Sequence, residues 1–174
     1  SGRRAREIEL TSYAELVLAR PAADRAHPAF SKMFVVTEFL PEFGALIATR
    51  RRRSPDEPGV WAAHFAVIEG DVIESVQYET DRARFASRDG TGWMPHIVAE
   101  GRPLSNTVGT VLDPVFSVRY SVRVRPGQAA RISFWTLVSD TRAAVLDLVD
   151  KHHDRSAFER AKTLAWTQAQ VQLR

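Results

Sequence analysis

Hydrophobic and polar positions alternate most regularly between residues 114 and 138 of the chain. Within residues 116–124 every even position is apolar and every odd position is polar. Successive side chains of a strand point to opposite faces, so this segment is predicted to lay one apolar face on a core and one basic face in water. Pro126 and Gly127 fit a type II turn, and a second alternating run follows over residues 130–135. The pattern predicts an antiparallel hairpin in which these two strands pair.

Further segments have the length and composition of strands. The run at residues 60–68 (VWAAHFAVI) is apolar at nearly every position, which is typical of a strand buried on both faces in the middle of a sandwich. A tight turn at residues 69–71 then leads to residues 72–79, the predicted partner strand. The other expected strands are residues 7–18 with a break near Ser12, residues 34–40 and residues 45–51.

Two stretches follow neither the strand nor the helix period. Residues 21–32 contain two prolines and several small residues, which predicts a loop with one helical turn. Residues 80–104 are interrupted by glycine and proline, so we expect a long connection with little regular structure, followed by a short strand over residues 105–112. Long ordered loops on a rigid sheet often carry functional contacts.

After Val138 the hydrophobic period changes from two residues to about 3.6, which predicts helices. The first is expected over residues 141–151, capped by Ser139 or Asp140, and its buried stripe is Ala144, Val145, Leu148 and Val149. The second is expected to begin at Ser156, where Ser156 and Glu159 fit a capping box. Because no helix stop signal precedes Arg174, we expect the chain to be part of a longer protein.

Composition and charge narrow the class of protein. A hydrophobic share of 44% agrees with a globular core, and the lack of cysteine excludes disulfides and thiolate chemistry. The isoelectric point near 9.7 suggests nucleic-acid binding, but the formal net charge is only +3. The arginine run at residues 50–53 also leads into an acidic loop, and no nucleic-acid-binding motif is present, so that partner is not expected. No apolar run approaches the roughly 18 residues of a membrane span, so we expect a soluble segment without direct membrane insertion.

The titratable clusters lack the arrangement of a catalytic or metal site. His152 and His153 point about 100° apart on a helix and chelate poorly together, so they are interpreted as cations at a helix C-terminus. His64 is expected as a hydrogen-bonded core residue, and His27, which precedes Pro28, as a structural one. Neighbouring carboxylates beside turns are expected in solvent, unlike the facing acids of a glycosidase. They are Glu38 with Glu42, Glu69 with Asp71, and Glu79 with Asp81. No catalytic residue, metal site or cofactor is predicted.

Tryptophans are the better candidates for ligand contact, because pyranose rings stack on aromatic faces through their C–H groups. Core or interface packing is expected for Trp61, Trp135 and Trp166, which lie in strand or helix patterns. Trp93 lies in the glycine-rich connection and is expected to face outward, towards a sugar or a neighbouring domain. With His96 and Arg82 from the same connection, it forms the predicted carbohydrate or domain contact.

Short segments along nearly the whole chain carry a family resemblance. They are residues 9–15 (ELTSYAE), 27–32 (HPAFSK), 76–82 (VQYETDR), 101–105 (GRPLS), 113–117 (DPVFS) and 166–173 (WTQAQVQL). Together they resemble the phosphorylase part of cyclic β-1,2-glucan synthases, in glycoside hydrolase family 94 with the cellobiose and chitobiose phosphorylases. The resemblance is weakest between residues 86 and 100, where the Trp93 loop stands in place of a Gly-Arg-Gly-type stretch.

The resemblance implies a mainly β fold, an antiparallel β-sandwich of the galactose mutarotase type with two C-terminal α-helices. Residues 1–139 would be the later half of a larger super-sandwich, and residues 140–174 linker helices leading to an (α/α)6 barrel. In that family the barrel holds the acid-catalyst aspartate and most of the phosphate site, so no catalytic residue is carried over to this chain.

The function expected from the resemblance is that of a non-catalytic domain of a glycosyltransferase or inverting β-glucan phosphorylase. The parent protein would lie on the cytoplasmic side of the bacterial inner membrane. Expected partners are the remaining domains of the parent, a β-glucan, and a second copy bound through a sheet edge or face. Two other functions stay open: a free-standing carbohydrate-binding module, and a mutarotase-type epimerase in which His64 and Glu79 converge in an open concave sheet.

Overall fold

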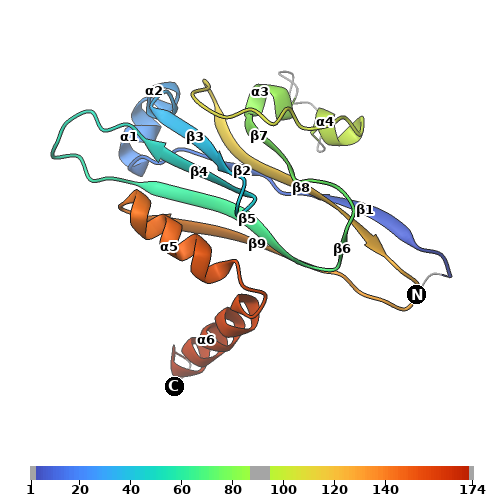
Figure 1. Cartoon of the computed structure of the whole chain (residues 1–174). Coiled ribbons are helices and arrows are strands. Elements are labelled where there is room, and N and C mark those ends of the chain that lie inside the picture. Colours follow the sequence, from blue (N-terminus) through green and yellow to red (C-terminus); the bar gives the residue numbers. More distant parts are fainter. Residues whose placement is uncertain (1–2, 87–94, 173–174) are drawn as a thin grey trace.

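The computed structural model describes residues 3–86 and 95–172 as a sandwich of two antiparallel sheets (Figure 1). The first sheet is built around β8 (Pro114–Val124). One edge of β8 pairs with β1 (Arg6–Thr11) and β2 (Ala14–Glu15), and the other with β6 (Asp71–Val72) and β7 (Gln77–Asp81). The second sheet has the order β3 (Val35–Leu40), β4 (Ala45–Arg50), β5 (Trp61–Glu69) and β9 (Arg131–Ser139). A mainly β sandwich is therefore confirmed.

Helices connect the strands and cover one face. The connections contain α1 (Pro21–Ala26), α2 (Pro28–Lys32), α3 (Arg82–Phe85) and α4 (His96–Ala99). Helix α5 (Arg142–His152) packs on the outer face of the second sheet, and α6 (Ala157–Gln172) extends away from both sheets (Figure 1). Among the described residues, no helix has both the length and the apolar character needed to cross a bilayer.

The core lies on both sides of the second sheet. Between the sheets, Phe116 and Val118 of β8 are buried against Leu46 and Ala62. On the outer face, α5 buries Val145 and Val149 against a cluster that includes Ile47 and Phe65. Each large apolar side chain buried in this way stabilises the fold by about 1.5–3 kcal/mol. Burial on both faces agrees with the continuous apolar run predicted for residues 60–68.

The predicted hairpin is wrong, because β8 and β9 lie in different sheets. The turn itself forms: the backbone N–H of Gln128 donates to the Arg125 carbonyl at 3.0 Å, and Gly127 adopts a φ of 73°. This φ lies in the left-handed region that favours glycine. Both edges of β8 are occupied by other strands, so the turn carries the chain from the first sheet to the second.

The predicted water-facing side of β8 is also wrong for most of its length. Ser117 and Ser121 are buried, Arg119 is only 2% exposed, and Arg123 alone of this set is exposed. Arg119 Nε donates to Thr11 Oγ1 at 2.9 Å, and its NH1 donates to the Arg102 carbonyl at 2.7 Å. The chain around Arg102 covers this face, and charged hydrogen bonds offset the cost of burying the guanidinium.

Two other strand predictions need correction. Residues 72–79 were expected to pair with residues 60–68, but β6 and β7 pair with β8. Residues 105–112 contain an isolated bridge rather than a strand, in which the N–H groups of Thr37 and Gly109 donate to each other's carbonyls at 2.9 and 3.0 Å. Residues 21–32 form two short helices instead of a single turn, whereas the break near Ser12 is confirmed.

The helix starts differ from the predicted caps. Thr141, rather than Ser139 or Asp140, caps α5, and its Oγ1 accepts from the Ala144 N–H at 3.2 Å. The predicted capping box is wrong too. The Ser156 N–H donates to Asp154 Oδ1 at 2.6 Å, and the Glu159 carboxylate pairs with Arg131 at 3.0 Å.

Candidate functional site

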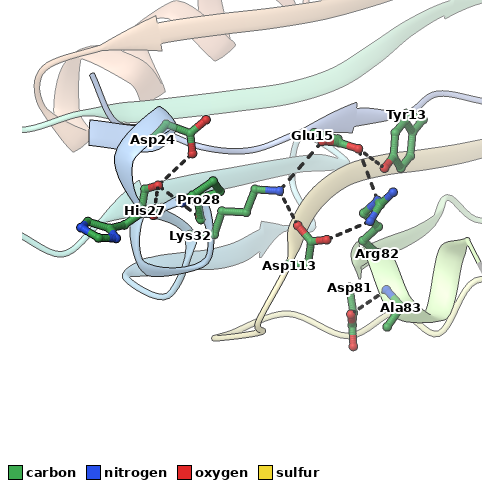
Figure 2. Close-up of polar contacts among 11 residues, drawn as sticks. Tyr13, Glu15, Asp24, His27, Pro28, Lys32, Asp81, Arg82, Ala83 and Asp113 are labelled. Atoms are coloured by element: carbon green, nitrogen blue, oxygen red, sulfur yellow. Dashed lines mark hydrogen bonds and ion pairs between the residues drawn. The ribbon is translucent and has the colours of Figure 1, made fainter. Parts of the chain in front are cut away.

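Four charged side chains from separate segments meet at one end of the sandwich (Figure 2). Asp113, just before β8, accepts from Lys32 Nζ at 2.7 Å and from Arg82 NH1 at 3.1 Å. Glu15 on β2 lies 3.3 Å from Arg82 Nε and 4.0 Å from Lys32 Nζ. We call Glu15, Lys32, Arg82 and Asp113 the ionic cluster. Its two positive and two negative charges balance.

Local structure holds the members of the ionic cluster in place. Asp81 Oδ1 accepts from the Ala83 N–H at 2.9 Å, which caps α3 and fixes the adjacent Arg82. Burial raises the pKa of Asp113, but the hydrogen bonds from Lys32 and Arg82 outweigh it and hold that pKa below its ordinary value. Asp113 is therefore a stable anion at neutral pH.

Tyr13 closes one side of the ionic cluster. Its hydroxyl donates to Glu15 Oε1 at 3.1 Å, and its ring stacks on buried Phe85 with centroids 4.9 Å apart. Burial raises the pKa of Tyr13 and Glu15 adds to this rise, against the opposing effect of Arg82. The hydroxyl therefore remains a hydrogen-bond donor at neutral pH rather than an activated base.

The ionic cluster draws on four of the segments that carry the family resemblance. Tyr13 and Glu15 belong to residues 9–15, Lys32 to residues 27–32, Arg82 to residues 76–82 and Asp113 to residues 113–117. Of these residues, only Arg82 was singled out as a candidate from the sequence. The other residues could have been found only through their positions in these short segments. That the segments lie side by side is seen only in the folded structure.

A groove of about 590 Å³ lies on the other side of α3, against α4 and the chain that follows it. His96, Arg102 and Glu100 form a polar triangle at this groove. The His96 Nδ1 to Arg102 NH2 distance is 2.7 Å, the His96 Nε2 to Glu100 Oε1 distance is 2.6 Å, and the Arg102 Nε to Glu100 Oε2 distance is 2.7 Å. His96 therefore accepts from Arg102 through Nδ1 and donates to Glu100 through Nε2. The triangle offers donors and acceptors suited to sugar hydroxyls.

Glu79 lies beneath the groove, so the solvent exposure predicted for this carboxylate is wrong. It is fully buried, and its Oε2 accepts from the Ser105 hydroxyl at 2.6 Å. Its Oε1 accepts from the N–H groups of Thr80 and Asp81, both at 3.0 Å. A carboxylate whose lone pairs are taken by backbone and hydroxyl donors holds the local structure together.

Two of the three predicted contact residues lie at different places in the described part of the chain. Arg82 belongs to the ionic cluster, whereas His96 lies at the groove, and Trp93 lies outside the described residues. Trp61 and Trp135 pack in the cluster beneath α5, as predicted. Trp166 is exposed on α6, so core packing is wrong for this residue.

His64 lies between the two sheets and is hydrogen-bonded on both sides of its ring. His64 Nδ1 lies 2.9 Å from Thr136 Oγ1 and its Nε2 lies 2.8 Å from Ser12 Oγ, so the predicted hydrogen-bonded core histidine is confirmed. Burial lowers the pKa of His64 to about 4. Since both ring nitrogens are used and neither contacts Glu79, the pair required for an epimerase does not form. In the described ranges, no group of histidines and carboxylates has the geometry of a metal site.

The family model of the glycosyl hydrolase 94 supersandwich domain matches residues 1–155. The chain belongs to this family. The supersandwich domain defined by the family thus includes both sheets and α5, whereas α6 follows the matched residues. Membership confirms the resemblance carried by the short segments.

A relative extends the similarity of this supersandwich domain to the last residue. The chain is 38% identical over 174 residues to the cyclic β-(1,2)-glucan synthase NdvB of Rhizobium meliloti (strain 1021). The match covers 100% of the chain but only 6% of the synthase, so the chain spans a small part of this relative.

Proposed function

We propose that this supersandwich domain is a non-catalytic part of a cyclic β-1,2-glucan synthase or β-glucan phosphorylase, and that it supports the catalytic part of its parent. The observation that carries the proposal is the similarity to the synthase, which runs over the whole chain. The ionic cluster agrees with it, because its charges are consumed in tying segments of the domain to one another. The parent acts in glucan synthesis or phosphorolysis at the cytoplasmic side of the inner membrane.

The test separates support from catalysis. The isolated chain is expected to give no turnover of β-1,2-glucan, with or without phosphate. In the parent enzyme, Asp113→Asn is expected to lower the yield of folded protein while leaving kcat and KM per folded molecule unchanged. Turnover by the isolated chain, or a fall in kcat without loss of folded protein, would contradict the proposal.

One side of the sandwich fits a further strand or domain of the parent, or a second copy. The stacked pair Phe39 and Tyr78 places β7 over β3, and the His64 to Ser12 contact places β1 and β2 over β5. The outer edges of β1 and β9 therefore lie on the same side, and no other described strand pairs with either of them. The opposite side is closed, because Gly109 bonds to β3 and Asn106 bonds to Tyr78 of β7. Exposed strand edges commonly recruit another chain.

Exposed apolar side chains on this open side suit it to contact with another chain or domain. Ile8 of β1 is 41% exposed, and Phe134 and Val138 of β9 are 39% and 62% exposed. By strand alternation all three share the inner faces of the sandwich, where apolar groups are normally covered. This surface supports self-association, or docking of the rest of the parent.

The groove favours a second function, carbohydrate binding. Its polar triangle of His96, Glu100 and Arg102 presents groups that pair with sugar hydroxyls. Titration calorimetry with β-1,2-glucan oligosaccharides is expected to give saturable binding that Arg102→Ala or Trp93→Ala reduces. Arg142→Ala, at an exposed ion pair with Glu38, is the matched control. If the titration shows no binding, carbohydrate binding is excluded and the supporting role remains the proposed function of the domain.

A further inference from the structure

Positive charge gathers at the end of the molecule formed by α1, α2 and the loop between β4 and β5 (Figure 1). Residues 20–31 and 50–60 contain six arginines and three carboxylates. Their excess of three positive charges equals the formal net charge of the whole chain, +3, so the remainder of the chain is balanced. The arginines are Arg20, Arg25, Arg50, Arg51, Arg52 and Arg53. We call this surface the basic end.

Two of the three acidic residues of the basic end, Asp24 and Glu57, bind groups other than the side chains of the exposed arginines. Glu57 pairs with buried Arg50 at 2.5 Å, and its second oxygen accepts from the Arg53 backbone N–H at 2.6 Å. Asp24 accepts from the Ser31 hydroxyl at 2.8 Å. Within the described residues, the ion pairs of this region involve Arg50 and none of the other five guanidinium groups. These five arginines are exposed.

Apolar side chains lie among the free cations. Phe30 on α2 is 46% exposed and Met33, which follows α2, is 47% exposed. The Arg53 guanidinium lies over the Phe30 ring, 5.8 Å from its centroid. A cleft of about 740 Å³ beside them is lined by Arg20 and Arg53, with apolar walls that include Leu18.

We propose that the basic end binds the anionic headgroups of a phospholipid surface. Exposed arginines attract the phosphate layer, while Phe30 and Met33 enter the boundary between headgroups and acyl chains. A nucleic acid or an acidic protein as partner would explain why the arginines are exposed. It would not explain why two large apolar side chains, Phe30 and Met33, are also exposed on this part of the surface. The inference rests on the membrane location in the proposed function and identifies the surface of this domain that makes the contact.

Vesicle co-sedimentation of the intact chain tests the lipid contact. Vesicles of phosphatidylcholine alone are compared with vesicles containing 30% phosphatidylglycerol at about 0.1 M salt, where exposed charges still act over roughly 10 Å. We expect binding only to the anionic vesicles. The triple variant Arg51→Gln, Arg52→Gln, Arg53→Gln is expected to weaken binding at least tenfold. The matched control Arg123→Gln, Arg125→Gln, Arg142→Gln removes the same charge from arginines in exposed ion pairs and is expected to bind as the original chain.

A second variant distinguishes lipid from other polyanions. Phe30→Ser with Met33→Ser is expected to reduce vesicle binding but not binding to heparin. No preference for anionic vesicles, full binding by the triple variant, or an equal effect of the serine variant on heparin would overturn the inference. Circular dichroism confirms that each variant is folded. Because the supporting role is tested by kcat and KM of the parent in detergent, without vesicles, failure of the lipid contact leaves that test unaffected.

Discussion

The side chain of His64 links the two sheets through hydrogen bonds. It projects from β5, and its partners are Thr136 on the adjacent β9 and Ser12 in the break between β1 and β2. Its ring stacks nearly parallel to Phe116 and Phe134, at centroid distances of 5.8 and 6.1 Å. This surrounding favours the neutral imidazole, because a charged ring between the sheets would lose its hydration.

Acidification is expected to destabilise the fold through His64. Its pKa is about 4 in the folded protein against an ordinary value of 6.5, so the unfolded chain binds the proton first as the pH falls. The contribution of this group is fully present above about pH 6.5 and is lost between 6.5 and 4. At about 1.4 kcal/mol per pH unit, the loss reaches about 3 kcal/mol. Urea unfolding at pH 7 and pH 4.5 measures it.

His64→Gln is the control for this pH dependence. Glutamine keeps hydrogen-bonding groups but does not titrate, so the variant is expected to be less stable at pH 7 and to lose about 2–3 kcal/mol less than the original chain between pH 7 and 4.5. Equal losses in the two proteins would show that His64 does not carry the effect.

Asp113 is expected to be the member of the ionic cluster that matters most for stability, because it accepts from both cations. Asp113→Asn should lower the free energy of unfolding by about 1–2 kcal/mol, a value kept modest because the cluster is partly exposed. Asp56→Asn, on the exposed loop after β4, is the matched control and should stay within about 0.5 kcal/mol. Equal effects in denaturant titrations would contradict a special role for the cluster.

Strands and helices could be located from the sequence, but their partners could not. Alternation identified the segments that became β8 and β9, a continuous apolar run identified β5, and length and composition identified β3 and β4. None of these patterns shows which strand lies beside which, and the six residues between β8 and β9 allowed a change of sheet. Ser117, Arg119 and Ser121 gave the pattern of a water-facing side, yet they are buried. Arg119 donates to the Arg102 carbonyl, and Ser121 donates to Glu74. The sequence pattern of a strand does not show whether a segment far away in the sequence covers one of its faces.

The candidate sites show the same limit. Arg82 and His96 were selected because they lie in an irregular connection, and both do line polar surfaces. Glu15, Lys32 and Asp113 were missed because the role of each depends on its contacts with other members of the cluster. The fold brings them together from β2, from the end of α2 and from the residue before β8. The acidic loop was expected to offset the arginine run, and Glu57 does pair with Arg50, but within the described residues no ion pair reaches Arg51, Arg52 or Arg53.

The N-cap of α5 gives a prediction for a single element. Thr141→Ala removes the hydroxyl that accepts from the Ala144 N–H and is expected to cost about 1 kcal/mol, because that donor then lacks its partner at the helix start. Ser139→Ala, at the end of β9, should change the unfolding free energy by less than about 0.5 kcal/mol. If the Ser139 variant proves the more destabilised in thermal unfolding, the cap has been misassigned.

One side of the sandwich is closed and the other is open at the outer edges of β1 and β9. We predict self-association through this open side. Light scattering is expected to give a mass that rises with concentration. Val138→Lys should shift the protein towards the monomer, because Val138 is exposed on β9 and a charge there disfavours an apolar contact. Leu112→Lys is the control, since Leu112 is 80% exposed and lies outside the strands of the open side. A strict monomer at high concentration would rule this contact out.

The central position of β8 also sets the order in which the chain can fold. Arg6 pairs with Val124, so the two strands that begin the first sheet stand 118 positions apart in the sequence. At about 5–20 residues per second, a ribosome needs on the order of ten seconds to make that stretch. During this time β8 has not been made, so β1 lacks the strand with which it pairs in the first sheet. The arrival of β8 then allows β1, β2, β6 and β7 to pair almost together, so the first sheet is completed only after β8 is made.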